Sequence, residues 1–375
     1  MNWRRTFLQL CLALVFGISL IPGGFAAGDR EGWKHYKNEG SRYEVFGDFA
    51  NAEKAYTRSL ELAGPPHASA AERGEVMARL ANAMLWQQKF ERAEPYFIEL
   101  LALIPKLKSE GKRNEDFFSC VEALSSTYFE RVRGVNKVSA IQHSIRIIDT
   151  AFGDIHPELP RELMELAYTY SALGMSREAL NFANRALAIA KRQTSDKGQI
   201  HLWKALTLVG TCKKSVGDWS GAQKSLEQAV SLMSKSPKRF SLTAAAAKAQ
   251  LSIVYFHMHR KEESRKLFRE AEALFLSRLL EVDKKGTRAI GGSGPELLPF
   301  AQMYVAFGQY EKAEPICRRS LLWTRMTYGD KEPLLINELR VHGFVLSRLG
   351  RLKESQGQEA AARALARLYR GDSEE

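Results

Sequence analysis

The chain has 375 residues, of which 45% are hydrophobic and 26% are charged, with 27 Gly, 12 Pro and 4 Cys. This balance excludes a disordered, a collagenous and a disulfide-rich chain. The formal net charge of +12 indicates an anionic partner without identifying it. Such a length ordinarily indicates two or three compact domains, unless the chain is a repeat array in which each repeat packs only on its neighbours.

The first 26 residues have the pattern of an export signal. Arg4 and Arg5 precede an apolar run at 7–21, and small residues follow at the two sites that a signal peptidase reads. The run is shorter than the roughly 20 residues that a bilayer span needs. We therefore expect a signal peptide at 1–26, cleavage near Ala26, and a periplasmic or secreted mature chain. An uncleaved N-terminal anchor is the alternative.

The export route is indicated by the residues around the arginine pair. Arg4 and Arg5 resemble the start of a twin-arginine signal. However, Trp3 stands where that signal prefers Ser or Thr, and Gln9 stands where it prefers Lys. The sequence therefore favours the general secretory route.

Cleavage leaves three cysteines, Cys120, Cys212 and Cys317, and a net charge of +10. Each cysteine falls in a predicted helix of a different repeat. We interpret all three as small buried apolar residues and expect no disulfide framework.

Residues 160–189 predict two helices joined by a tight turn. Leu163, Leu166 and Tyr170 lie on one helix face. Gly174 follows, and Gly readily takes the left-handed conformation that ends a helix. Small residues at spacings of four and three then indicate a second helix that approaches the first closely. These small residues are Ala179, Ala183 and Ala186.

The same pattern recurs along the chain and resembles the tetratricopeptide repeat. Gln88 replaces the turn Gly in the second repeat, and the third repeat has no clear turn Gly. The resemblance implies an all-α fold, a right-handed α-solenoid superhelix of about eight helix-turn-helix repeats within 27–370. The repeats lie near 33–63, 74–105, 118–149, 160–190, 203–234, 245–276, 294–325 and 336–370.

The repeat period is longer than the standard one. Successive repeats start 41 to 49 residues apart, whereas the standard period is about 34 residues. The connectors at 152–157 and 328–333 resemble the Gly-x-x-His-Pro connector of the kinesin-light-chain type, although Glu332 replaces the His in the second. The longest step contains the glycine-rich segment 286–294. No strand precedes it and no Gly-Lys-Ser/Thr follows, so we interpret it as a flexible insertion and a candidate hinge.

The sequence does not contain the residue patterns of common enzymes. It has no HExxH and no paired CxxC motif. His257 and His259 are two residues apart, so they point in different directions on a helix and are poorly placed to share a metal ion. We therefore predict that the chain is not an enzyme and that it holds no catalytic residue, metal or cofactor.

By resemblance to the family, the first helix of each repeat lines a concave groove. We therefore expect a scaffold or adaptor that binds a peptide or helix of another protein there. The chain does not match the family's C-terminal carboxylate clamp, because Ser41 and Arg79 stand where Asn is required. The candidate groove residues are Lys37, Asn38, Arg79, Asn82, Trp86, Phe129, Tyr168, Lys204, Lys214, Gln250, Phe256, Asn337, Arg340 and Phe344.

The positive charge is concentrated in one segment. Residues 191–290 hold 20 basic and 9 acidic side chains, whereas residues 27–190 hold 21 and 23. The alternative function is therefore binding of an anionic non-protein envelope ligand, or of an acidic protein segment, through 191–290. Export argues against nucleic acid, and a merely solubilising basic face stays open. The candidate basic patch is Lys213, Lys214, Lys238, Arg239, Arg265 and Lys266.

Overall fold

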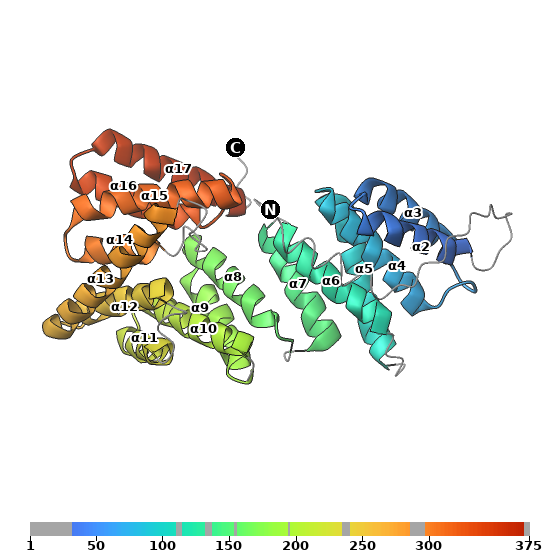
Figure 1. Cartoon of the computed structure of the whole chain (residues 1–375), viewed down its shortest axis with the longest axis horizontal. Coiled ribbons are helices and arrows are strands. Elements are labelled where there is room, and N and C mark those ends of the chain that lie inside the picture. Colours follow the sequence, from blue (N-terminus) through green and yellow to red (C-terminus); the bar gives the residue numbers. More distant parts are fainter. Residues whose placement is uncertain are drawn as a thin grey trace. The chain divides into compact units, whose positions relative to one another are not determined.

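A computed structural model describes most of the chain. In the described ranges the chain forms sixteen helices and no strand (Figure 1), so the predicted all-α class is confirmed. The expected signal at 1–26 and the insertion at 286–294 lie outside these ranges. The described residues are 32–109, 115–131, 137–153, 156–193, 196–234, 241–285 and 297–370.

Consecutive helices pack in antiparallel pairs, as the positions of the predicted turns require. The helices are α2 (Gly32–Val45), α3 (Phe49–Leu62), α4 (Ala70–Trp86), α5 (Phe90–Ser109), α6 (Glu115–Arg131), α7 (Lys137–Phe152), α8 (Leu159–Ala172), α9 (Ser176–Ala190), α10 (Asp196–Ser215), α11 (Trp219–Ser234), α12 (Ser241–His257), α13 (Lys261–Lys285), α14 (Leu298–Ala306), α15 (Tyr310–Tyr328), α16 (Leu335–Arg348) and α17 (Leu352–Arg370).

The chain divides into two compact units. Unit 1 comprises residues 1–132 and 142–154, and unit 2 comprises residues 133–141 and 155–375. Within unit 2, the helices on either side of the insertion share one hydrophobic core. Phe275 of α13 stacks on Phe300 of α14 with ring centroids 4.1 Å apart.

Small residues allow the paired helices to approach closely. Gly210 of α10 faces α11, and a Cβ atom there would lie 2.6 Å from the Leu226 side chain. The three alanines predicted to press α9 against α8 are fully buried, as expected for close packing. They are Ala179, Ala183 and Ala186.

The turns inside the helix pairs use the left-handed backbone conformation. Gly174 has φ +84° between α8 and α9. In two other helix pairs a residue with a side chain takes this left-handed conformation. Gln88 has φ +62° and His259 has φ +59°. A left-handed conformation costs an ordinary residue about 1 to 2 kcal/mol, so these two turns are strained relative to the glycine turns.

Gln88→Gly is therefore expected to raise the free energy of unfolding by up to about 1 kcal/mol, because glycine carries no steric penalty at this φ. The Gln88 side chain is exposed, so few contacts are lost. Gly174→Gln is the reciprocal control and should lower stability by about 1 kcal/mol. Thermal unfolding of the full chain measures both. A lower melting temperature for Gln88→Gly would contradict the expectation.

Candidate functional site

The first helices of successive pairs in unit 2 pack side by side. Contacts join α8 to α10, α10 to α12, α12 to α14 and α14 to α16. We call the surface that these five helices form the first-helix wall. Eight candidate groove residues belong to these helices, namely Tyr168, Lys204, Lys214, Gln250, Phe256, Asn337, Arg340 and Phe344. The other candidates lie in unit 1, where the side chain of Phe129 is outside the described residues.

In unit 1, three candidate groove residues pair with carboxylates of the same unit. The Lys37 Nζ lies 3.1 Å from the Glu75 carboxylate, and the Arg79 Nε donates to the same carboxylate at 3.0 Å. The Asn82 Nδ2 donates to Glu44 at 2.9 Å. Glu75 is only 4% exposed. In unit 1, cations for which the sequence predicted ligand contacts are therefore neutralised by internal carboxylates.

Trp86 of α4 joins two helix pairs. Its ring stacks on Phe49, which begins α3 of the preceding pair, with centroids 4.8 Å apart and planes 6° apart. The same arrangement recurs in unit 2, where Trp219 begins α11 and stacks on His257 of α12 at 4.5 Å. Neither Phe49 nor Trp219 is among the candidate groove residues, although an aromatic residue directly after the turn was a usable signal.

Three aromatic side chains of the first-helix wall remain exposed to solvent. Tyr168 on α8 is 37% exposed, Phe256 on α12 is 43% exposed and Phe344 on α16 is 46% exposed. The Phe256 ring contacts that of Phe307 with centroids 5.3 Å apart. Exposed aromatic side chains are enriched where proteins bind other proteins. These residues are therefore suited to anchor a bound segment.

A polar chain crosses the first-helix wall from α10 to α14. The Lys214 Nζ donates to the Gln250 Oε1 at 2.5 Å, and the Gln250 Nε2 donates to the Gln302 Oε1 at 2.9 Å. Gln250 is only 3% exposed. Burial lowers the pKa of Lys214 to about 8. Burial also lowers the pKa of His257, and the Lys214 charge contributes to that shift.

The remaining candidates of the wall make other contacts. The Lys204 ammonium lies over the Trp203 ring, 5.7 Å from its centroid. The Arg340 Nη1 donates to the Ala172 carbonyl oxygen at 3.2 Å. Asn337 on α16 is partly buried, and Asn38, which lies in unit 1 outside the first-helix wall, is exposed.

The candidate basic patch is distributed over two helices in the described part of the chain. Lys213 lies on α10, 4.0 Å from an Asp218 carboxylate oxygen. Arg265 lies on α13 and pairs with Glu262 at 3.2 Å, and Lys266 beside it is exposed. Lys238 and Arg239 lie outside the described residues. The described cations therefore do not share one helix face.

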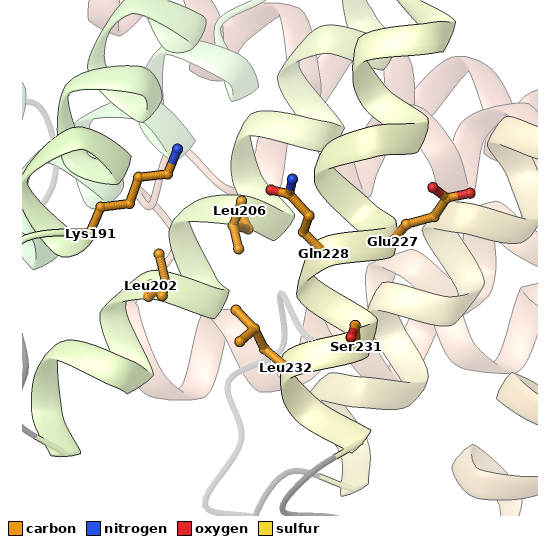
Figure 2. Close-up of a pocket in the computed structure, with 7 residues that line it drawn as sticks. All are labelled: Lys191, Leu202, Leu206, Glu227, Gln228, Ser231 and Leu232. Carbon is orange, nitrogen blue, oxygen red and sulfur yellow. The ribbon is translucent and has the colours of Figure 1, made fainter.

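An open surface pocket of about 490 Å³ is lined by residues of α10 and α11 and by Lys191, which follows α9. Leu202 and Leu206 of α10 face Leu232 of α11 across it (Figure 2). Glu227 at its rim already accepts a hydrogen bond from the Tyr255 hydroxyl at 2.5 Å. Most of the surface that lines the pocket is apolar. The full lining is Lys191, Leu202, Leu206, Glu227, Gln228, Ser231 and Leu232.

The described ranges contain no group of three or more His, Cys, Asp or Glu residues arranged to hold a metal ion. None of the helices described there is long and apolar enough to span a membrane.

Sequence comparison relates part of the chain to plant proteins. No family model matches the chain. Protein KINESIN LIGHT CHAIN-RELATED 1 of Arabidopsis thaliana is 23% identical over 225 residues, which are 60% of this chain and 36% of that protein. Protein KINESIN LIGHT CHAIN-RELATED 3 of the same plant is 25% identical over 169 residues, 45% of this chain and 25% of that protein. The matches thus span about a third or less of these curated relatives.

Solved structures with a similar arrangement of helices were also found. The quorum sensor NprR from B. thuringiensis is 13% identical, with 96% of this chain and 92% of that chain covered and a TM-score of 0.47. A tetratricopeptide repeat protein from Parabacteroides merdae is 12% identical, with 86% and 98% covered and a TM-score of 0.43. Both scores lie below 0.5, so the relationship rests on the sequence matches and the repeated helix pairs.

Proposed function

Since the chain is a tetratricopeptide-repeat protein of the kinesin-light-chain-like subtype, we propose that it is an exported scaffold or adaptor that binds a peptide or helix of another protein. The observation that carries this proposal is the set of exposed aromatic residues on the first-helix wall. Tyr168, Phe256 and Phe344 come from three different helix pairs, so a long segment can contact all three. A wall that is already folded limits the ordering cost of binding.

We place the protein in the periplasm or outside the cell and assign it no catalytic step. The leader pattern at 1–26 supports export. The residue patterns of the mature chain support a binding role rather than a catalytic one. Because the curated relatives are matched over at most 36% of their length, their own activities are not transferred.

Capture from an envelope extract tests the proposal. We expect that proteins retained by the full chain are recovered at least about tenfold less with Tyr168→Ala/Phe256→Ala/Phe344→Ala, because truncating aromatic anchors costs more than about 1 kcal/mol each. The matched control is Leu276→Ala/Leu322→Ala/Met326→Ala, which truncates exposed apolar residues of the second helices α13 and α15. The control should retain the same proteins as the wild type.

Equal recovery with both triple variants, or no specific protein with the wild type, would contradict the proposed site. Recovery of an anionic polymer instead of a protein would favour the alternative function. Charge reversal at Lys213, Lys214, Lys238 and Arg239 tests that alternative, because binding that survives this change and added salt is not electrostatic.

A further inference from the structure

We infer that Lys214 is the binding site for a side-chain carboxylate, from an aspartate or glutamate within the segment that the first-helix wall holds. The inference rests on the proposed function and deepens it, because it names the chemistry that one position of the segment must carry. It assigns a role to Lys214 that neither helix packing nor an internal ion pair provides.

Within the described part of the chain, the Lys214 ammonium has a single hydrogen-bond acceptor, and this acceptor is uncharged. Its Nζ donates to the Gln250 Oε1 at 2.5 Å, and no described Asp or Glu forms an ion pair with it. A lysine ammonium carries three N–H donors. Two of the three therefore have no acceptor among the described residues, and the Lys214 side chain keeps part of its surface exposed to solvent.

The neighbouring amides hold the ammonium in position. Because the Gln250 Nε2 donates to Gln302, the carbonyl oxygen of Gln250 is turned towards Lys214. Gln250 is 3% exposed, so its side chain has little freedom to reorient. The three residues come from α10, α12 and α14, which places the ammonium on the first-helix wall. A ligand carboxylate would thus meet a donor whose position is already set.

Two other partly buried lysines, Lys37 and Lys248, have a carboxylate partner. The Nζ of Lys37 lies 3.1 Å from Glu75, and the Nζ of Lys248 lies 2.6 Å from Glu270. Removing a cation from water without a counter-charge is unfavourable. At Lys214 the protein supplies a neutral amide instead. A ligand carboxylate would complete the pair and would strengthen the hydrogen bond through its charge.

The position of Lys214 within the wall favours a side-chain carboxylate over a chain terminus. The wall continues from α10 to α8 on one side and to α12 on the other, and it carries exposed Tyr168 and Phe256 there. A segment that contacts both aromatic residues crosses α10, and with it Lys214, in its middle. Its carboxylate at Lys214 then comes from an Asp or Glu side chain.

A displayed library of random dodecapeptides tests this inference, because each peptide is fused through its C-terminus and offers only side-chain carboxylates. The library is selected on the full wild-type chain, on Lys214→Met and on Lys213→Met. Lys213→Met is the matched control, since it removes one positive charge from the adjacent residue of the same helix, where Asp218 already lies 4.0 Å away. We expect enrichment of Asp or Glu at one position with the wild type and the control, and loss of that enrichment with Lys214→Met.

One enriched peptide then provides a binding constant. Lys214→Met should weaken its binding about tenfold or more, as expected for a charge-assisted hydrogen bond. Replacing the selected Asp or Glu of the peptide by its amide should weaken binding similarly, and the two changes together should cost little more than either alone. The melting temperature of Lys214→Met should be unchanged or higher, because the removed charge is poorly solvated in the folded state.

The outcomes separate the two proposals. Enriched peptides without an acidic preference, or with one that persists in Lys214→Met, would overturn the role of Lys214 and leave the scaffold function standing. A library from which the wild type enriches no peptide would count against the scaffold function itself, and against this inference with it.

Discussion

Replacing Phe300 with alanine is expected to lower the free energy of unfolding of unit 2 by about 3 to 5 kcal/mol, the range for removing a buried aromatic side chain. Phe300 is completely buried, and its ring stacks on Phe275 at a centroid distance of 4.1 Å. The substitution removes this contact and leaves a cavity between α13 and α14. Because α13 and α14 flank the insertion, their loss of packing should separate the helix pairs on either side of it.

Phe46→Ala is the matched control, because the same change is made at a side chain that is 84% exposed. It should alter stability by less than about 0.5 kcal/mol. Urea unfolding followed by circular dichroism measures both variants, and hydrogen exchange of the α12 to α15 amides locates the effect. A Phe300→Ala variant as stable as Phe46→Ala would show that the core across the insertion does not hold unit 2 together.

Glu75→Ala is expected to lower the stability of unit 1 by about 2 to 4 kcal/mol, because it leaves two partly buried cations without their shared carboxylate. The Glu75 side chain is 5% exposed, and those of Lys37 and Arg79 are 21% and 20% exposed. Arg79 keeps a weaker partner in Glu44, at 3.7 Å. Because this pair remains, we expect a smaller loss of stability than when one partner of a fully buried ion pair is removed.

The control for this change is Glu61→Ala in the same unit. Glu61 pairs with Arg58 at 2.8 Å, but the two side chains are 54% and 56% exposed. An exposed ion pair of this kind contributes up to about 1 kcal/mol, and usually less. Thermal unfolding, with hydrogen exchange of the α2 and α4 amides, compares the two variants. Equal effects on stability would mean that the pairing of Glu75 with Lys37 and Arg79 contributes no more than an exposed ion pair.

The two units thus treat the cations of their first helices differently. In unit 1, Lys37 and Arg79 meet Glu75, so an incoming carboxylate would have to displace an internal one. In unit 2, Lys214 meets the neutral amide of Gln250. For this reason we place the acidic-ligand site in unit 2 and regard the unit 1 contacts as a source of stability.

The predictability of the site follows from how far apart its parts lie in the chain. The left-handed turn at Gly174 and the buried face of Ala179 were recognisable because a turn glycine and a helical period are local patterns. Tyr168 and Phe256 were expected on the first helices by resemblance to the family. Their exposure follows from the packing around them, and the sequence pattern does not report that packing.

The sequence by itself determined the all-α class and the succession of helix pairs, and the resemblance to the family assigned the candidate side chains to the first helix of each pair. Only the tertiary structure decided which of the candidate cations are neutralised. The Lys37–Glu75 pair spans 38 residues and the Lys214–Gln250 pair spans 36, about one repeat in each case. Whether a cation meets a carboxylate or an amide at that separation depends on the packing of adjacent helix pairs. The electric field at a side chain is set by neighbours in space, and a local sequence pattern does not contain them.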